Sequence, residues 1–214
     1  MTLIAGGCSG PLSALDPAGP AAASILTLMS VLLGLAAVSF VVIFGIFLLA
    51  LRRNRSREAS LRLFMIGGGL AFPLVLLTVA TVYAVVLGER IVGARTDADL
   101  TVEATAQQWR WQFTRQTAGG SASRTGILDI PAGRTIEVRV ASTDVIHSFW
   151  VPRLGGKIDA IPGTVNRILI RADVPGRYGG VCAEFCGTGH TGMDFTVVAH
   201  DADAWARIEN GGEP

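Results

Sequence analysis

The stretch AAASILTLMSVLLGLAAVSFVVIFGIFLLAL, residues 21–51, contains no charged side chain. A bilayer core is crossed by about 20 consecutive apolar residues in helical form. This run is apolar on every side of a helix rather than along one stripe, which is typical of a membrane span and not of a buried helix in a water-soluble domain. We therefore predict a transmembrane helix over residues 22–51.

A second apolar run of sufficient length covers residues 63–87, and Pro73 within it is expected to kink the helix. The segment between the two runs holds one acidic residue, Glu58, and five basic ones: Arg52, Arg53, Arg55, Arg57 and Arg62. Short positively charged loops stay in the cytoplasm. The sequence thus predicts a helical hairpin over residues 22–90, with both of its ends on the outer face of the membrane.

The segment before the hairpin, residues 1–21, contains Cys8 after the small residues of LIAGG. This order resembles a bacterial lipoprotein cleavage box, after which the cysteine is acylated, but the seven preceding residues are too few for a hydrophobic signal region. Cys8 is therefore either a lipidated anchor, with the true start further upstream, or an unpaired thiol. Both readings stay open at this point.

The remaining chain, residues 97–214, has the texture of an all-β domain. TIEVRV, residues 135–140, alternates polar and apolar side chains as a half-buried strand does. Similar short segments occur at residues 100–106, 109–115, 126–130, 166–171 and 194–199. Several strands at this spacing indicate a β-sandwich or barrel. Residues 119–123 are expected to form a flexible hairpin tip, and residues 201–208 a short helix capped by Asp201.

The charge of this domain is mildly acidic. Residues 97–214 contain 11 Lys plus Arg and 14 Asp plus Glu, so 11 − 14 gives −3 without histidine. Such a surface suits a basic protein partner and argues against nucleic acid, although an ordinary solvated surface explains so small an imbalance equally well.

The segment CAEFCGTGHTGM, residues 182–193, brings two cysteines, a histidine and a methionine within twelve residues. Thiolate, imidazole and thioether are the ligands that copper prefers in electron-transfer sites, which take a second histidine from an upstream strand. The upstream candidate is His147. Two bridging thiolates, Cys182 and Cys186, would hold two metal ions rather than one.

Two other readings of the cysteines compete with copper. In an oxidising compartment the pair would form a disulfide, and zinc would use cysteine and histidine. Neither reading gives a role to Met193, so the complete pattern favours copper. The third histidine of the chain, His200, has no place in the motif and is expected on the surface.

This segment, with DVIHSFWVP at residues 144–152 and GKIDAIPG at residues 156–163, resembles subunit II of cytochrome c oxidase, whose family binds a binuclear copper centre called CuA. The resemblance covers nearly the whole chain. It implies a membrane-anchored all-β protein, in which an N-terminal two-helix transmembrane hairpin precedes an extracytoplasmic cupredoxin-like Greek-key β-barrel.

The resemblance also assigns roles to single residues. Cys182 and Cys186 would bridge two copper ions, and His147 and His190 would each cap one. Met193 would be a weak axial ligand to one copper, and the Glu184 carbonyl would be a ligand to the other. The Glu184 carboxylate would reach toward a magnesium ion shared with subunit I. Trp109 would be the point where the electron arrives.

The resemblance further implies a place in the bacterial inner membrane, with the copper domain on the periplasmic face beside subunit I and subunit III. The function it implies is to accept electrons from cytochrome c and pass them to haem in subunit I, where oxygen is reduced to water. Asp144 matches an acidic docking position, but Arg110 and Gln112 interrupt the family's aromatic run. Two alternatives are a non-redox structural subunit, as in quinol oxidases, and a membrane-anchored copper carrier.

Overall fold

The computed structural model describes residues 8–52, 62–92, 98–117 and 120–211. It divides into two compact units, one formed by the chain up to Leu26 and from Arg95 onward, the other by Thr27–Ala94. Most of the basic loop between the predicted spans, including Glu58, lies outside the described residues.

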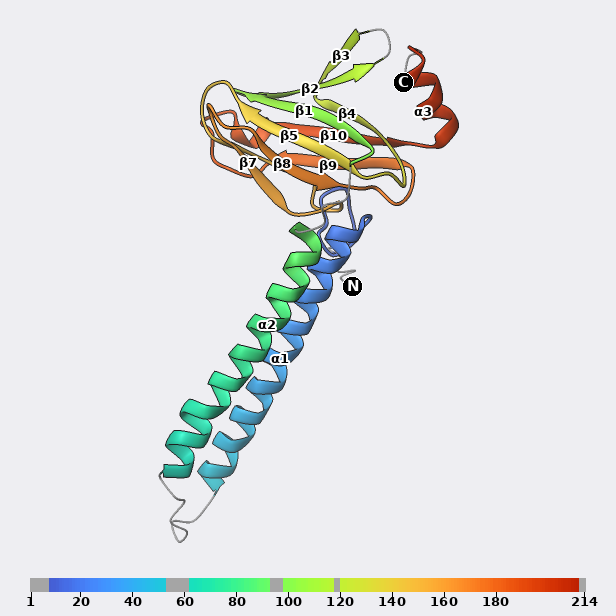
Figure 1. Ribbon diagram of the computed structural model, residues 1–214. Coiled ribbons are helices and arrows are strands. Elements are labelled where there is room, and N and C mark those ends of the chain that lie inside the picture. Colours follow the sequence, from blue (N-terminus) through green and yellow to red (C-terminus); the bar gives the residue numbers. More distant parts are fainter. Residues whose placement is uncertain (1–7, 53–61, 93–97, 118–119, 212–214) are drawn as a thin grey trace, which may run out of the picture. The chain divides into compact units, whose positions relative to one another are not determined.

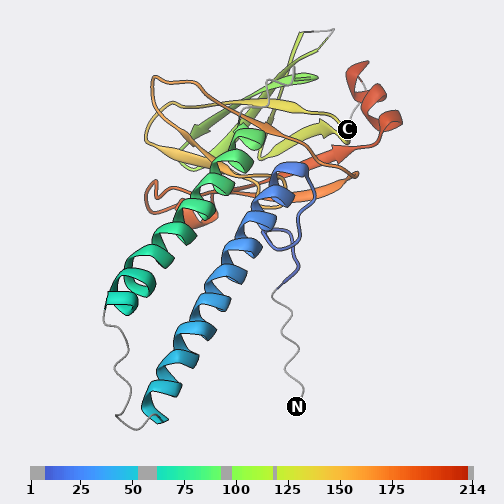
Figure 2. The same ribbon diagram turned by 60° about the horizontal axis from the view of Figure 1, so that its bottom comes forward.

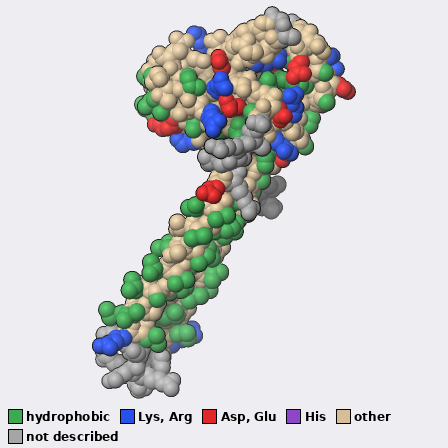
Figure 3. Space-filling view, viewed as in Figure 1, with side chains coloured by type: hydrophobic (Ala, Val, Ile, Leu, Met, Phe, Trp, Pro, Cys, Tyr) green, Lys and Arg blue, Asp and Glu red, His purple; other side chains and the backbone are tan. Residues whose placement is uncertain are grey.

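Both predicted spans are confirmed as helices. Helix α1 runs over Pro20–Arg52, and the second span consists of the π-helical segment η1 (Leu63–Ala71) followed by α2 (Phe72–Val92). Both are long and apolar enough to cross a membrane. The two helices can be followed as ribbons in Figure 2, and hydrophobic side chains cover much of their visible surface in Figure 3. Such a surface is stable when lipid surrounds it.

Pro73 lies directly after the irregular part of the second span. The N–H of Phe72 donates to the Gly67 carbonyl, five residues back, as in a π-helix. Proline has no N–H to donate, and its ring clashes with the carbonyl of the residue four positions earlier. π-helical turns thus precede Pro73, while the kink expected there stays a prediction.

The β-domain consists of two five-stranded sheets (Figure 1). The first has the order β3-β2-β1-β5-β8 and the second the order β4-β10-β9-β6-β7. The strands are β1 (Leu100–Gln107), β2 (Arg110–Thr117), β3 (Gly120–Thr125), β4 (Ile127–Pro131), β5 (Ile136–Ser142), β6 (His147–Trp150), β7 (Lys157–Ala160), β8 (Asn166–Ile170), β9 (Gly176–Cys182) and β10 (Asp194–His200). Parallel pairing of β1 with β5 and of β4 with β10 joins strands that are not consecutive in the chain.

The core lies between these sheets and follows the predicted alternation. In β5, Ile136, Val138 and Val140 are fully buried while the residues between them face outward. Four aromatic rings, those of Trp111, Phe113, Phe149 and Phe195, pack against one another with centroids 4.9 to 6.4 Å apart. These rings come from both sheets, so their packing joins the two sheets in the core.

The six predicted strands correspond to β1, β2, β4, β5, β8 and β10, whereas β3, β6, β7 and β9 were missed. Strand β9 is rich in glycine, and Gly180 is required there because an added Cβ would lie 2.2 Å from the Phe195 ring. Strands β6 and β7 have only four residues each. The prediction of a flexible tip was wrong for residues 120–123, which pair with β2 as part of β3.

The segment before α1 packs on the β-domain instead of running free. Ala18 donates its N–H to the Arg153 carbonyl at 2.7 Å and accepts from the Asp173 N–H at 2.9 Å. Asp16 forms an ion pair with Arg153 at 2.9 Å. Cys8 lies further out and is exposed.

The C-terminal helix is confirmed and the expectation for His200 was wrong. Helix α3 covers Ala202–Glu209, and the Asp201 carboxylate accepts the Ala204 N–H at 2.8 Å. The His200 side chain is only 12% exposed, and its Nε2 lies 2.8 Å from the buried Asp129 carboxylate. Arg124 approaches the other oxygen of Asp129 at 2.6 Å. A buried carboxylate needs such partners, and these draw His200 inward.

Candidate metal centre

The predicted ligands come from two neighbouring strands and the loop that follows one of them. His147 begins β6, and Cys182 ends β9, which pairs with β6 through Phe149 opposite Cys182. The chain then continues as the ligand loop, defined here as residues 182–193, which closes when the Cys182 N–H donates to the Met193 carbonyl at 3.0 Å. Residues 35 positions apart in the sequence therefore meet at one end of the second sheet.

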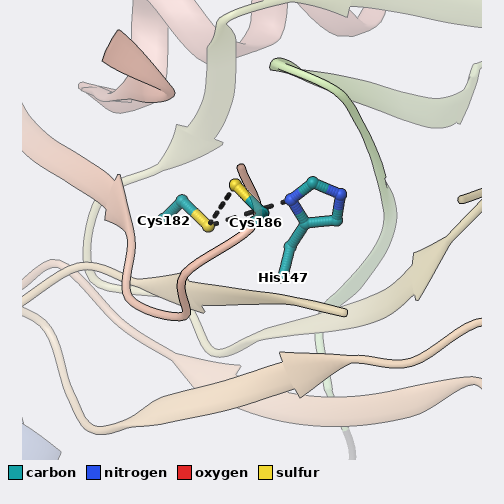
Figure 4. A group of neighbouring side chains, drawn as sticks. All are labelled: His147, Cys182 and Cys186. Atoms are coloured by element: carbon teal, nitrogen blue, oxygen red, sulfur yellow. Dashed lines mark hydrogen bonds between the residues drawn. The ribbon is translucent and has the colours of Figure 1, made fainter. Parts of the chain in front are cut away.

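Three of the ligand atoms form one compact group (Figure 4): the Cys182 and Cys186 sulfurs and a His147 ring nitrogen all lie within 4.8 Å of one another. The two sulfurs are 3.8 Å apart, and the Cys182 sulfur lies 3.9 Å from Nδ1 of His147. The sequence prediction that His147 reaches both cysteines agrees with this geometry.

The spacing of the two sulfurs excludes one of the competing readings, the disulfide. A disulfide bond is about 2.05 Å long, so the pair at 3.8 Å is not bonded, and both cysteines are free thiols. Two sulfurs bound at about 2.3 Å to one tetrahedral metal ion lie about 3.8 Å apart. The separation therefore suits two thiolates that share a metal.

The other predicted ligands divide between the two cysteines. Nδ1 of His190 and Sδ of Met193 lie 3.6 and 3.8 Å from the Cys186 sulfur. The Glu184 carbonyl oxygen lies 3.2 Å from the Cys182 sulfur, while the Glu184 residue as a whole is exposed. Each thiol thus has one imidazole and one weaker donor close to it.

Burial shapes the acid–base behaviour of the thiols. Cys182 and Cys186 are 6% and 4% exposed. Burial, reinforced by the neighbouring Cys182, raises the pKa of the Cys186 thiol to about 11. Without a metal this thiol is protonated at neutral pH, so metal binding must release its proton.

The His147 ring is fixed by Asp144, whose Oδ1 lies 2.8 Å from Nε2. Burial pushes the pKa of Asp144 upward, but hydrogen bonds from the Gln108 N–H, the His147 ring and the Val145 N–H lower it further, to about 2. The ionised carboxylate can only accept, so Nε2 carries a proton, and in the neutral ring Nδ1 then holds the lone pair, 3.9 Å from the Cys182 sulfur. This is the tautomer that a metal ligand requires.

The two tryptophans that were predicted on one strand lie in different environments. Trp111 on β2 is completely buried and contacts the His147 ring edge-on, with centroids 6.3 Å apart. Trp109 precedes β2 in a turn and is 42% exposed. Its indole Nε1 lies 3.3 Å from the Cys186 carbonyl oxygen. Trp109 is therefore the aromatic ring that connects solvent to the ligand loop.

Sequence reasoning gave Asp144 a docking role and gave Gln108 none. In the structure both belong to the hydrogen-bonded surroundings of the ligands, because Gln108 donates its side-chain amide to the Cys186 carbonyl at 2.8 Å. The position of Asp144, three residues before a ligand histidine, was a signal for its contact with the ring. Gln108 lies 78 residues from Cys186, and no local pattern marks it.

The part of the chain that carries the ligands matches the family model described as cytochrome c oxidase subunit II, periplasmic domain, over residues 123–200. The chain is 34% identical to cytochrome c oxidase subunit 2 of Alkalihalophilus pseudofirmus over 96% of its own length. It spans 65% of that relative, just under two thirds.

Two further relatives match the chain over different lengths. Quinol oxidase subunit 2 of Bacillus cereus is 27% identical, with 97% of this chain and 76% of that protein aligned. The crystal structure of the periplasmic domain of cytochrome oxidase subunit II from Bradyrhizobium japonicum superimposes with a TM-score of 0.50 at 30% identity, covering 54% of this chain and 94% of that one.

Proposed function

Because the chain belongs to the cytochrome c oxidase subunit II family, we propose that it is the electron-accepting subunit of a membrane-bound haem-copper oxidase. In this role it takes one electron at a time from a cytochrome c and passes each to haem in subunit I, where oxygen is reduced to water. The observation that carries the proposal is the convergence of two unbonded thiols, two imidazoles and a thioether in one cluster, of which only His190 is partly exposed.

We assign two copper ions to this pocket. The donor set is soft, as copper prefers, and the buried Met193 gives zinc no advantage. In the proposal Cys182, Cys186, His147 and His190 would hold the two ions, with both thiolates shared between them. The weak donors are Met193 on one side and the Glu184 carbonyl on the other. When bound, the copper pair supplies a one-electron redox centre.

The protein's own contribution is a rigid and dry setting for these ligands. Asp144 holds the His147 ring, and Trp111, one of the four packed core rings, contacts that ring edge-on. Ligands that cannot move between oxidation states keep the reorganisation cost of electron transfer low. Trp109, half exposed and hydrogen-bonded to the Cys186 carbonyl, is the proposed point at which the donor's electron arrives.

The proposed setting is the bacterial inner membrane, crossed twice by residues 22–90. Residues 97–214 then form the copper domain on the periplasmic face, the topology that a positively charged cytoplasmic loop favours. Subunit I would lie beside the chain and subunit III would complete the complex. The exposed Glu184 carboxylate is proposed to reach a magnesium ion shared with subunit I.

The main alternative is a structural subunit without copper, since a quinol oxidase subunit is among the relatives. A second alternative is a copper carrier. Carriers need ligands that exchange readily, whereas His147, Cys182 and Cys186 are nearly or fully buried. The presence of every ligand type at metal-binding distances favours the electron-transfer role over both.

The decisive experiment compares the full chain with its Cys186→Ser variant. After copper loading in detergent, the wild type should bind two copper ions and show the near-infrared band and the shared-electron resonance signal of a copper pair. Serine cannot bridge as thiolate does, so the variant should lose both signals and, in the assembled oxidase, turnover. Equal turnover of the two proteins would refute the proposal.

A milder change tests where the electron arrives. Trp109→Phe removes the indole N–H but keeps an aromatic ring, so copper content should stay at the wild-type value while oxidation of reduced cytochrome c slows. Stopped-flow kinetics and copper analysis on the same samples separate the two quantities. If copper is lost in parallel with the rate, Trp109 supports the loop and does not conduct.

A further inference from the structure

The turn between β1 and β2 is tied to the ligand loop at a single carbonyl group. The Cys186 oxygen lies 2.8 Å from the Gln108 side-chain nitrogen and 3.3 Å from the Trp109 indole nitrogen. Two consecutive residues of the turn therefore donate to the backbone of one candidate ligand. The shorter and stronger of the two bonds belongs to Gln108 and not to the tryptophan.

Gln108 is itself held from its other end. Its backbone N–H donates to Oδ2 of Asp144 at 2.7 Å, while Oδ1 of the same carboxylate contacts the His147 ring at 2.8 Å. One residue thus connects the surroundings of His147 to the backbone of Cys186. Because charge-assisted hydrogen bonds are the stronger ones, the backbone of this turn is well fixed.

Glycines in the ligand loop allow the Trp109 ring to pack directly against the loop backbone. A Cβ added to Gly189 would lie 2.4 Å from the Trp109 ring, closer than real contacts allow. Gly187 has a φ of +120°, a conformation that L side chains rarely adopt, and a Cβ there would lie 3.2 Å from the Gln108 amide nitrogen. The ring is therefore pressed against the loop, with no side chain between them.

We propose that Gln108 is a positioning residue for electron transfer: its bond to the Cys186 carbonyl holds Trp109 against the ligand loop. The inference rests on the proposed function. In that transfer one electron leaves the reduced donor and arrives at the copper pair, and no bond is made or broken. The indole bond alone is long and the Trp109 residue is 42% exposed, so Gln108 supplies the restraint that keeps the ring in place.

Replacing the amide should loosen the ring without emptying the site. Gln108→Leu has nearly the same shape but no donor, and none of the predicted metal ligands changes. A displacement of about 1 Å in a reacting group can cost up to about 100-fold in rate. We expect oxidation of reduced cytochrome c to slow roughly tenfold, with copper content and the near-infrared band unchanged.

The first readout uses the metal-free full chain in detergent, labelled with 5-fluorotryptophan. The chain has four tryptophans, and the Trp109→Phe variant assigns the fluorine resonance of Trp109. In Gln108→Leu the chemical shift of the Trp109 resonance should change, and the difference between its values in H2O and D2O should grow. The resonances of the other three tryptophans should not change. The matched control is Asn166→Leu, which removes a similar amide-to-carbonyl bond, 2.7 Å from the Asp159 oxygen. That control should leave the Trp109 resonance and the donor rate unchanged.

The results separate this inference from the proposed function. A wild-type chain that binds no copper pair refutes the function, and the inference with it. Given a loaded wild type, the inference is overturned by an unmoved Trp109 resonance, by an unchanged donor rate, or by loss of copper comparable to that in Cys186→Ser. Should Gln108→Leu not fold, Gln108→Met removes the same donor with an unbranched side chain and is judged by the same criteria.

Discussion

Two histidines of the β-domain pair with a carboxylate at the same distance, yet they lie in different settings. Nε2 of His147 is 2.8 Å from Asp144, and Nε2 of His200 is 2.8 Å from Asp129. A large aromatic ring lies 6.3 Å from each imidazole, Trp111 beside the first and Trp205 beside the second. A histidine–carboxylate pair with an aromatic neighbour is therefore not in itself the mark of a metal site.

The two pairs differ in what lies near the second ring nitrogen and in whether an arginine also contacts the carboxylate. Nδ1 of His147 faces a buried thiol, and nearby metal-binding donors surround it. At the other pair Arg124 also contacts Asp129, so the carboxylate is balanced by an arginine. The first pair orients a ligand, whereas the second stabilises a buried charge in the fold.

The largest expected contrast comes from removing each imidazole. His147→Ala should abolish the resonance signal of the copper pair, because one of its two capping nitrogens is lost. His200→Ala should retain that signal at full intensity. Resonance spectra and copper analysis of both variants measure this, and equal losses would show that the two pairs do not differ in the way described.

A smaller contrast is expected from the acids. Asp144→Asn keeps the shape of the side chain but removes its charge, and loss of such a partner typically weakens metal affinity by roughly 10- to 100-fold. Asp129→Asn should leave copper affinity unchanged. Competition with a copper chelator gives both affinities, and a shift for Asp129→Asn as large as for Asp144→Asn would contradict the assignment.

The smallest effect is expected on stability. His200→Ala leaves the Asp129 carboxylate, whose side chain is 6% exposed, with one partner fewer. Loss of a buried hydrogen bond to a charged group costs about 1–3 kcal/mol. The thermal midpoint of the copper-free chain should fall for His200→Ala, and Arg207→Ala on the exposed side of α3 provides a baseline for a surface change. An unchanged midpoint would mean that the pair contributes nothing to folding.

The clustering of the predicted ligands was predictable from sequence because it depends mainly on short spacings. Cys182, Cys186, His190 and Met193 lie on one loop, and only His147 had to be found at a distance. The two helices long and apolar enough to cross a membrane were predictable for a related reason, since a run without charges needs no tertiary context. Alternation likewise located β5, whose buried residues face a single core.

The features that were missed depend on contacts between distant parts of the chain. No strand was predicted around Gly180, because its glycine is required by the Phe195 ring, which occupies the space a side chain would need. His200 turned inward because Asp129, 71 residues earlier, lies beside it. Gln108 owes its role to a carbonyl 78 residues away. None of these pairings leaves a local pattern.

The graded exposure of the pocket has a consequence for how the site is filled. His147 and Met193 are sealed from solvent and both thiols nearly so, whereas His190 is partly exposed, beside the Phe185 ring at 5.7 Å. We therefore expect an incoming metal ion to meet His190 first and the deeper His147 imidazole last. A partner bound over the exposed Phe185 ring would cover this edge of the site.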